Sequence, residues 1–285
     1  MKLSIITINY NNAEGLHRTL ASVATQTYRN LEHIIIDAAS TDGSVDIIKE
    51  YAERPITDNR SPLTVIWSSE KDKGIYDGMN KGIRKATGDY VWILNSGDCV
   101  VGADVVERMM AILERESYPL LMGNIVKVYS DDRKVSEKKM HDANTPKTFD
   151  VSMLTFYKGT VPQDAAFVRR DLFEKYGYFD ETMKICADWK LYLNMIAFGN
   201  VVPMYVDIDV VLFDMTGVSN ANMEKRNAEK RAYLEEILLP SVLKDYDAYS
   251  FPIDQYKRLK KYHLWGLVYF IERVLFKLEK WRILK

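Results

Sequence analysis

The chain has 285 residues, a length that one large α/β domain with an appendage would account for. Hydrophobic residues make up 47% and charged residues 28%, which indicates a globular protein with a substantial core. The formal net charge of −1 provides no overall positive field, so the composition argues against a protein that binds nucleic acid.

Apolar segments alternate with helical patterns through the first hundred residues. The segments expected to be buried strands are residues 2–10, 31–37, 63–69 and 89–94, and the helices expected between them are residues 13–26, 44–53 and 74–87. Strand and helix repeated in this way predict right-handed crossovers and a doubly wound, mostly parallel sheet flanked by helices. The fold class is therefore α/β and Rossmann-like.

Polar residues gather where each expected strand ends, in residues 7–11, 37–42, 68–73 and 95–98. Ligands of such sheets bind at the carboxyl ends of the strands. Three of these four clusters contain carboxylates, which suit a divalent cation that would supply positive charge for a phosphorylated substrate. No GxGxxG follows the first strand and no GxxxxGK[ST] occurs, so dinucleotide oxidoreductases and P-loop kinases are disfavoured.

Each of these acidic residues has an ordinary explanation when it is taken alone. Asp42 and Asp98 are both compatible with turn or helix-capping roles. Asp72 and Lys73 are typical of a solvated run of charges. Their common position at one edge of the expected sheet is what favours a binding site.

The second half continues with a strand, a short helix and a turn over residues 162–181, followed by a helix over residues 185–199. Residues 220–243 are strongly helical, and a break is expected at Phe251–Pro252. Residues 255–285 then form an apolar helical stripe accompanied by nine basic and two acidic residues. The basic residues are Lys257, Arg258, Lys260, Lys261, Arg273, Lys277, Lys280, Arg282 and Lys285.

This basic amphipathic helix, with Trp265 and Trp281, predicts a segment that lies on an anionic membrane surface. The alternative is a helix that packs on the α/β domain or on a second subunit of a homodimer. Two cysteines, Cys99 and Cys186, and the absence of a secretory leader lead us to expect a cytoplasmic protein, peripheral at the inner face of the membrane. No run of roughly 18 apolar residues predicts a transmembrane helix.

Four motifs stand in an order that resembles a known enzyme family. They are SIITINYNN, IIDAASTDGS, SEKDKGIYDGMNKGIRKATGDYVWILNSGD and VPQDAAFVRRDLFEKYGYFDETMKICADWKLYLNM. Together they resemble the family 2 glycosyltransferases over roughly residues 1–220. The resemblance implies a GT-A type fold, with a nucleotide-sugar half at residues 1–100, an acceptor half at residues 101–220 and a helical C-terminal extension at residues 221–285.

The resemblance implies a divalent cation, Mn²⁺ or Mg²⁺, that bridges the protein and the diphosphate of the donor. In the family the fourth strand ends in a DxD-like turn whose last carboxylate holds this metal, which corresponds to Asp98. A cation there would neutralise charge on the departing nucleoside diphosphate. Asn95 and Gly97 stand where many relatives have acidic residues, so we expect a weaker site that phosphates or water complete.

A donor-binding set is implied in the same way. Asp37 matches the family position that accepts hydrogen bonds from the base, where a carboxylate suits a uracil-like imide, and Tyr10 would stack on that base. Asp77 is expected on the ribose or the donor sugar, whereas Lys81 is expected to be a solvated helix lysine. The donor-binding residues implied are Thr7, Asn9, Tyr10, Asp37, Asp72, Gly74, Asp77, Asn95 and Ser96.

Asp188 matches the catalytic base of the family, which deprotonates the acceptor hydroxyl as it attacks the anomeric carbon. Direct displacement assisted by one base inverts the configuration. Taken alone, an acidic residue in a first helical turn is explained by the helix dipole. Ala187 stands where relatives commonly have Glu or Asp, so Asp188 would act without that neighbour.

Three residues are candidate acceptor contacts. Gln163 and Asp164 follow a proline where relatives often have a His–Gln or similar pair, and either would contact the acceptor or the metal-bound phosphate. Trp189 is the third, although its spacing with neighbouring apolar residues favours a core position. The four histidines, His17, His33, His141 and His263, show no ligand spacing.

The function implied is an inverting, metal-dependent transfer of a sugar from a nucleotide-diphosphate donor, a UDP-sugar, to a hydroxyl of a glycan or lipid-linked acceptor. The resemblance also implies a role in the synthesis of bacterial polysaccharides of the cell envelope. The alternative is a catalytically degenerate nucleotide-sugar-binding protein of the same fold. A nucleotidyltransferase is disfavoured, because the chain lacks the glycine-rich, lysine-bearing N-terminal loop that triphosphate handling needs.

Overall fold

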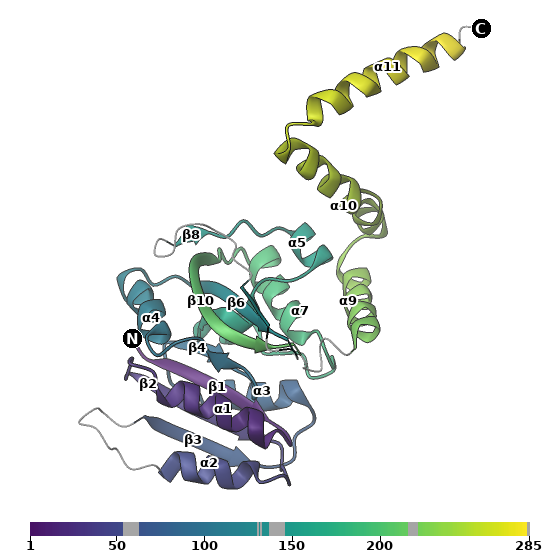
Figure 1. The fold of residues 1–285 in the computed structure, drawn as a ribbon. Coiled ribbons are helices and arrows are strands. Elements are labelled where there is room, and N and C mark those ends of the chain that lie inside the picture. Colours follow the sequence, from purple (N-terminus) through teal and green to yellow (C-terminus); the bar gives the residue numbers. More distant parts are fainter. Residues whose placement is uncertain (54–62, 130, 132, 137–145, 216–221, 284–285) are drawn as a thin grey trace. The chain divides into compact units, whose positions relative to one another are not determined.

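The computed structural model describes residues 1–53, 63–129, 131, 133–136, 146–215 and 222–283. The chain divides into two compact units, Met1–Arg231 and Ala232–Lys285 (Figure 1). The first unit contains the sheet, and the second is helical. The division of residues 1–220 into a donor half and an acceptor half remains a prediction.

The described part of the first unit forms one sheet of ten strands. The strands are β1 (Leu3–Asn9), β2 (Leu31–Asp37), β3 (Thr64–Ser69), β4 (Tyr90–Ile93), β5 (Cys99–Val100), β6 (Leu120–Val128), β7 (Lys134–Ser136), β8 (Lys147–Thr148), β9 (Ala166–Arg169) and β10 (Met204–Asp214). The α-helices are α1 (Ala13–Ala24), α2 (Ser44–Glu53), α3 (Ile75–Lys85), α4 (Val105–Arg115), α5 (Met153–Lys158), α6 (Asp171–Tyr176), α7 (Ala187–Leu193), α9 (Met223–Ile237), α10 (Pro240–Lys261) and α11 (Trp265–Ile283).

The strands follow the order β3-β2-β1-β4-β9-β6-β10-β5, with β7 beside β6 and β8 beside β10. The first four strands are mutually parallel, which confirms the predicted alternation of strand and helix. Beyond β4 the sheet is mixed, because β9 runs antiparallel to both of its neighbours while β10 runs parallel to β6. The N-terminal half of the sheet is therefore wholly parallel, and the C-terminal half combines the parallel pair β6–β10 with antiparallel pairs.

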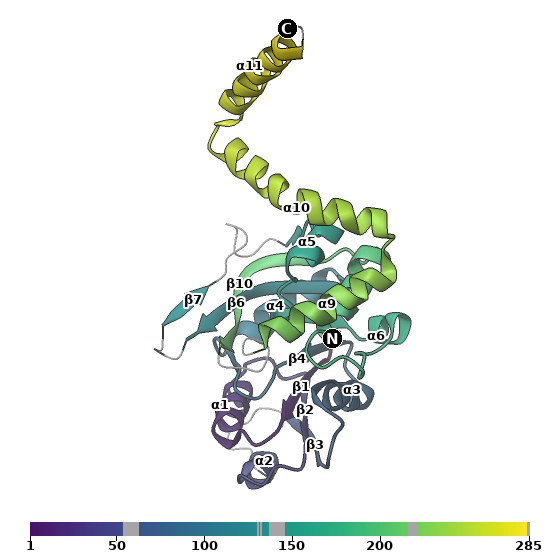
Figure 2. The ribbon, with the colours of Figure 1, turned by 90° about the vertical axis from the view of Figure 1, so that its right-hand side faces the viewer.

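Helices cover both faces of the parallel strands. α1 and α2 lie on one face and α3 on the other, as Figure 2 shows. On the first face Leu16, Leu20, Ile35, Ile48 and Tyr51 form a buried cluster. On the second face a Cβ atom at Gly82 would lie 2.4 Å from the side chain of Ile6, so glycine allows α3 to lie directly on β1. The helices thus cover the two faces of the sheet, and loops lie at the carboxyl ends of the strands.

One predicted boundary was wrong. The helix around Pro252 does not break there, because α10 continues through it to Lys261. The fixed φ of proline suits a helix, and α10 accommodates both the missing backbone hydrogen bond and the contact of the ring with the carbonyl four residues earlier. The helix instead ends at Lys261. Tyr262 caps it, and the next residue, His263, has a φ of +57°. The predicted helix at residues 185–199 is α7 followed by a π-helical turn, η2 (Asn194–Phe198).

Candidate active site

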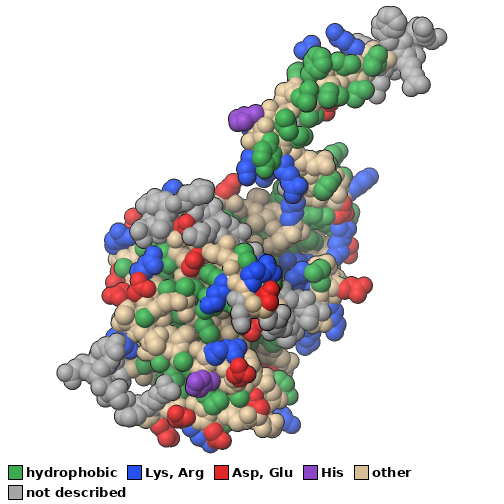
Figure 3. Space-filling model, viewed as in Figure 1, with side chains coloured by type: hydrophobic (Ala, Val, Ile, Leu, Met, Phe, Trp, Pro, Cys, Tyr) green, Lys and Arg blue, Asp and Glu red, His purple; other side chains and the backbone are tan. Residues whose placement is uncertain are grey.

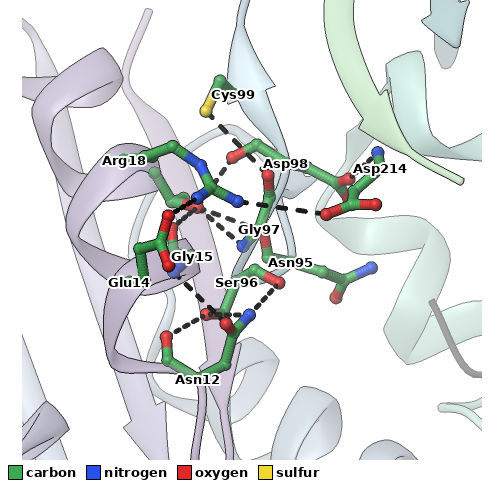
Figure 4. Close-up of polar contacts among 11 residues, drawn as sticks. Asn12, Glu14, Gly15, Arg18, Asn95, Ser96, Gly97, Asp98, Cys99 and Asp214 are labelled. Carbon is green, nitrogen blue, oxygen red and sulfur yellow. Dashed lines mark hydrogen bonds and ion pairs between the residues drawn. The ribbon is translucent and has the colours of Figure 1, made fainter. Parts of the chain in front are cut away.

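The turn after β4 is held tightly against α1 (Figure 4). The Asp98 N–H donates to the Asn95 carbonyl at 3.0 Å, and Gly97 has a φ of +106°, a conformation that favours glycine. Thr19 of α1 accepts from the Gly97 N–H at 3.0 Å and donates its hydroxyl to the Asp98 carbonyl at 2.7 Å. These bonds fix the backbone that carries the Asp98 carboxylate.

Ser96 also helps to hold the turn after β4 against α1. Its hydroxyl and carbonyl oxygens both accept from Asn12 Nδ2 at 3.2 Å, while Asn12 Oδ1 caps α1 by accepting from the Gly15 N–H. The structure therefore places Ser96 in the junction between the turn and α1. A contact between Ser96 and a donor remains a prediction.

Asp98 lies where negative charge is concentrated. Its side chain is buried, and Oδ1 accepts from the Asp214 N–H at 2.9 Å. Burial raises the pKa of Asp98 well above its usual range, and the charges of Asp164 and Asp214 add to that rise. Figure 4 shows Arg18 of α1 reaching toward Asp214, with Nη2 4.0 Å from Oδ2. A cation beside Asp98 would relieve this repulsion, so the residues present fit a metal ion.

The protein alone does not complete such a site. Among the described residues no group of three His, Cys, Asp or Glu side chains is arranged to hold a metal. A cation bound by Asp98 would take its remaining ligands from phosphate oxygens and water, which hard divalent cations accept.

Asp37 is saturated by hydrogen bonds at the end of β2. Oδ1 accepts from Asn9 Nδ2 at 2.8 Å and from the Ser40 hydroxyl at 2.6 Å, and Oδ2 accepts from the Ser40 N–H at 2.9 Å and the Ser69 hydroxyl at 2.6 Å. Burial raises the pKa of Asp37, but these hydrogen bonds outweigh burial and hold it below its usual value. The carboxylate is charged, and a base N–H would have to displace one of these donors.

Unpartnered polar atoms also gather at these strand ends. Asn9 Oδ1, Ser68 Oγ and Asn95 Oδ1 are buried without a hydrogen-bond partner. Buried polar atoms without partners are uncommon, so hydrogen-bonding capacity is unused here. Tyr10, at the same edge, is 67% exposed, as a residue that stacks on a ligand would be.

Thr7, one of the predicted donor-binding residues, is buried in the sheet. It is fully buried, its hydroxyl donates to the Leu94 carbonyl at 2.8 Å, and it lies 2.9 Å from His33 Nε2. These contacts give Thr7 a packing role between β1 and its neighbours.

The start of α3 brings further carboxylates to the edge. Gly74 has a φ of +132°, and its N–H donates to Asp72 at 3.0 Å. Burial raises the pKa of Asp72, and the charges of Asp77 and Asp37 add to that rise against the Gly74 hydrogen bond. Asp77 accepts from the Lys73 N–H at 2.9 Å.

Lys81 is not the solvated lysine that the sequence favours. Its ammonium group lies 3.3 Å from Asp77 and 3.2 Å from Glu70, and its side chain is 23% exposed. The ion pair with Glu70 fastens α3 to the segment that follows β3, and the ion pair with Asp77 lies within α3.

Asp188, in the first turn of α7, is held by groups from three parts of the chain. Oδ1 accepts from the Trp189 N–H at 2.7 Å and from the Tyr76 hydroxyl at 3.3 Å, and the Gln163 amide donates to Oδ2. Burial raises the pKa of Asp188, and the Trp189 and Tyr76 hydrogen bonds and the charge of Lys230 oppose that rise. An oriented carboxylate with a raised pKa has the properties of a general base.

Asp164 connects the two carboxylates. It lies in a short 3₁₀ turn, η1 (Gln163–Ala165), and burial followed by the charge of Asp188 raises its pKa to about 7. The charge of Asp164 also contributes to the raised pKa of Asp98. Asp98 and Asp188, 90 residues apart in the sequence, therefore both interact with one intervening carboxyl group.

Trp189 occupies the core. Its side chain is buried, and the indole N–H donates to the Phe156 carbonyl at 3.0 Å. Gln163, by contrast, lies beside Asp188 and accepts from the Thr160 hydroxyl at 3.1 Å. Of the three candidate acceptor contacts, Gln163 and Asp164 are at the site and Trp189 is a packing residue.

Asp164→Asn is expected to stabilise the metal-free protein at pH 8. The pKa of Asp164 is about 7 in the folded state against 3.8 for an ordinary aspartate, so stability present at low pH is lost as the pH rises through this interval. The substitution should raise the free energy of unfolding by about 4 kcal/mol at pH 8 and by progressively less toward pH 4. Urea unfolding at both pH values measures this.

Asp150→Asn is the control for this substitution, because Asp150 is exposed. Its stability should match the wild-type value within about 0.5 kcal/mol at both pH values. An Asp164→Asn protein that is less stable than the wild type at pH 8 would contradict the account of Asp164.

Sequence reasoning missed three residues of the site: Tyr76, Asp214 and Lys230. Tyr76 lies two residues beyond Gly74, between residues that the family resemblance implies in donor binding. Asp214 ends the last strand, and the rule that ligands bind at strand ends would have found it. Lys230 stands in a strongly charged helix, where nothing local distinguishes it from a solvated residue.

A sheet with four parallel strands, a carboxylate turn after the fourth and a second oriented carboxylate on α7 is the arrangement of a GT-A type glycosyltransferase. The chain belongs to glycosyl transferase family 2, whose family model matches residues 4–177. It is 33% identical over 221 residues to an uncharacterised glycosyltransferase of Mycobacterium tuberculosis, covering 76% of this chain and 77% of that protein. The chain is therefore a glycosyltransferase, as its resemblance to the family predicts.

Another relative is a PGL/p-HBAD biosynthesis glycosyltransferase of Mycobacterium bovis, 29% identical over 224 residues, which are 78% of this chain and 80% of that protein. Among solved structures, S. aureus TarS has a TM-score of 0.60 at 20% identity and matches 88% of this chain, although the chain spans only 43% of TarS. The mannosyltransferase PcManGT from Pyrobaculum calidifontis, in complex with GDP-Man and Mn²⁺, has a TM-score of 0.59 at 18% identity, covering 87% of this chain and 69% of that one. These likenesses confirm the fold.

Proposed function

We propose that this enzyme transfers a sugar, with inversion, from a nucleotide-diphosphate donor to a hydroxyl group of a glycan or lipid-linked acceptor. The observation that carries the proposal is the position of Asp164, whose charge interacts with both Asp98 and Asp188. This shared interaction supports a candidate metal ligand and a candidate base that act in one site, as displacement at an anomeric carbon requires.

The donor we propose is a UDP-sugar held at the carboxyl ends of β1 to β4. Asp37 supplies a charged acceptor for the imide of the base, and Tyr10 supplies an exposed ring. Relatives of this fold support a nucleotide donor: one TarS structure is a complex with UDP, another is a complex with UDP-GlcNAc, and PcManGT is a complex with GDP-Man and Mn²⁺.

In the reaction the oxygen of the acceptor hydroxyl bonds to the anomeric carbon while the bond from that carbon to the diphosphate breaks. Asp188 accepts the proton of the hydroxyl. Tyr76 and Gln163 hold the carboxylate, so that an oxygen lone pair is oriented toward the acceptor. Asp98 would hold the divalent cation, Mn²⁺ or Mg²⁺, which supplies positive charge to the leaving diphosphate.

A panel of nucleotide sugars tests the proposal. Thermal unfolding of the full chain would be measured with UDP- and GDP-sugars, each with and without Mn²⁺, followed by nucleotide release from those that bind. We expect UDP-sugars to raise the melting temperature most, and only with Mn²⁺. Binding without any release, to water or to a hydroxyl acceptor, would favour the degenerate binding protein. No shift with any donor would contradict the proposal.

For the C-terminal segment we propose reversible binding to an anionic membrane surface. Exposed apolar side chains run along α11, among them Leu267, Phe270, Val274 and Leu278, and Figure 3 shows hydrophobic atoms gathered on this helix. From residue 256 on, the exposed basic residues in the described part of α10 and α11 are Lys257, Arg258, Lys260, Lys261, Arg273 and Lys277. Trp265 and Trp281 have side chains that lie outside the described residues. None of the described helices has the length and apolar character that crossing a bilayer requires.

Replacing Lys257, Lys260 and Lys261 with glutamine should weaken binding to phosphatidylglycerol vesicles by on the order of 100-fold at low salt, since each basic residue near an anionic surface contributes about 1 kcal/mol. Co-sedimentation measures the effect, and high salt should release the wild type. A protein in which Lys85, Lys134 and Lys225 become glutamine is the control. If the wild type does not bind these vesicles, α10 and α11 instead pack against another part of the protein or form a homodimer interface.

A further inference from the structure

The first half of α9 is fastened to the backbone that leads into α7. The Glu229 carboxylate accepts hydrogen bonds from the N–H groups of Lys184 at 2.8 Å, Ile185 at 2.9 Å and Cys186 at 3.1 Å. N–H groups at the start of a helix lack partners within the helix, and an acidic residue near them is favoured by the helix dipole. Cys186 Sγ also lies 3.4 Å from the Arg226 carbonyl. This segment of α9 and the start of α7 are therefore held together by several bonds.

Lys230, the residue after Glu229, lies beside the candidate base. Its ammonium group lies 5.2 Å from the ring centroid of Trp189, the residue that follows Asp188, and donates to the Gly159 carbonyl at 3.1 Å. Burial lowers the pKa of Lys230, and the charges of Cys186 and Asp188 oppose that effect. The charges of a partly desolvated cation and a partly desolvated carboxylate therefore interact.

Lys230 also reaches Asp188 through a second route. The Gly159 carbonyl that it holds precedes Thr160, whose hydroxyl donates to Gln163 at 3.1 Å. The Gln163 amide in turn donates to Asp188. The same ammonium group thus supports the loop that orients the carboxylate.

We propose that Lys230 is a positioning residue of the active site, which Glu229 sets in place and which keeps the Asp188 carboxylate charged and oriented. The inference rests on the proposed role of Asp188 as the base. It makes α9, a helix whose sequence resembles a solvated one, part of the catalytic machinery.

The direction of the effect follows from the charges around Asp188. A positive charge favours the carboxylate form, so removing Lys230 should raise the pKa of Asp188 and move the acidic limb of the pH–rate profile to higher pH. The other titratable groups that face Asp188 do not change in this substitution. They are Tyr76 of α3, Asp164 of η1, Cys186 before α7 and Tyr192 of α7.

The test is an NMR titration of the full-length protein labelled with ¹³C at the aspartate carboxyl carbons. The Asp188 resonance is identified by its absence in Asp188→Asn. In Lys230→Met we expect this resonance to titrate about half a unit to one unit higher than in the wild type, whereas Lys230→Arg should restore the wild-type value. Lys225→Met, on the exposed side of α9, is the matched control and should leave the titration unchanged.

Two results would overturn the inference. One is an unchanged Asp188 titration in Lys230→Met with melting temperature and nucleotide binding retained. The other is the same shift in Lys225→Met. If Lys230→Met does not fold, Lys230→Gln provides the titration in its place. Failure of the proposed function would look different, because Asp188→Asn would then retain transfer while the Asp188 resonance still responded to Lys230.

Discussion

Asp188→Asn is expected to lower sugar transfer by about 100-fold or more while donor binding is retained. Asparagine keeps the shape of the side chain and can still accept the hydrogen bonds from Trp189 and Tyr76. It cannot accept the proton of an acceptor hydroxyl. The loss should therefore appear in the rate of transfer, and the affinity for the nucleoside diphosphate should not change.

Steady-state transfer measures the first effect and calorimetric titration with UDP and Mn²⁺ measures the second. Asp46→Asn is a matched control, because Asp46 is an exposed acidic residue in the first turn of α2. It should transfer at the wild-type rate. If Asp188→Asn loses nucleotide binding and turnover together, Asp188 has a structural role and the assignment of the base is wrong.

Asp98→Asn is expected to weaken Mn²⁺-dependent binding of UDP by on the order of 100-fold, equivalent to about 2.7 kcal/mol. The amide oxygen preserves the hydrogen bond that the Asp214 N–H donates, so the turn should keep its geometry. What is lost is the negative charge that a cation requires. Because burial disfavours the Asp98 carboxylate, the variant should also be at least as stable as the wild type without metal.

Asp104→Ala is the control for this prediction, because Asp104 is exposed and lies only six residues further along the chain. It should bind UDP with Mn²⁺ as the wild type does. UDP binding that is equally strong in Asp98→Asn and the wild type, and equally dependent on Mn²⁺, would remove Asp98 from the metal site.

The parallel half of the fold was predictable because its signals are local. Each strand from β1 to β4 is a short apolar run bounded by polar turns, and each intervening helix has its own apolar face. The mixed half was harder to predict, since β9 enters between β4 and β6 through pairing with distant strands. The break expected at Pro252 failed because proline disfavours a helix without excluding it.

The residues of the candidate site that could be predicted are those at the end of a strand or the start of a helix, where ligands commonly bind. Asp98 and Asp188 stand at the end of a strand and the start of a helix, and the structure brings both to Asp164. Thr7 also stands near a strand end, but β1 is buried on both faces, so the side chain of Thr7 packs inside the fold. Lys230 and Tyr76 meet Asp188 only through tertiary contacts, so no local pattern marked them.

The most direct test of the account is anomalous diffraction, at the manganese absorption edge, from crystals of the full chain grown with UDP and Mn²⁺. The account predicts one strong peak bonded to a carboxylate oxygen of Asp98 and to the diphosphate, with the uracil at Asp37 and Asp188 facing the same site. A diphosphate bound away from the ends of β1 to β4, or a manganese ion that does not touch Asp98, would contradict it.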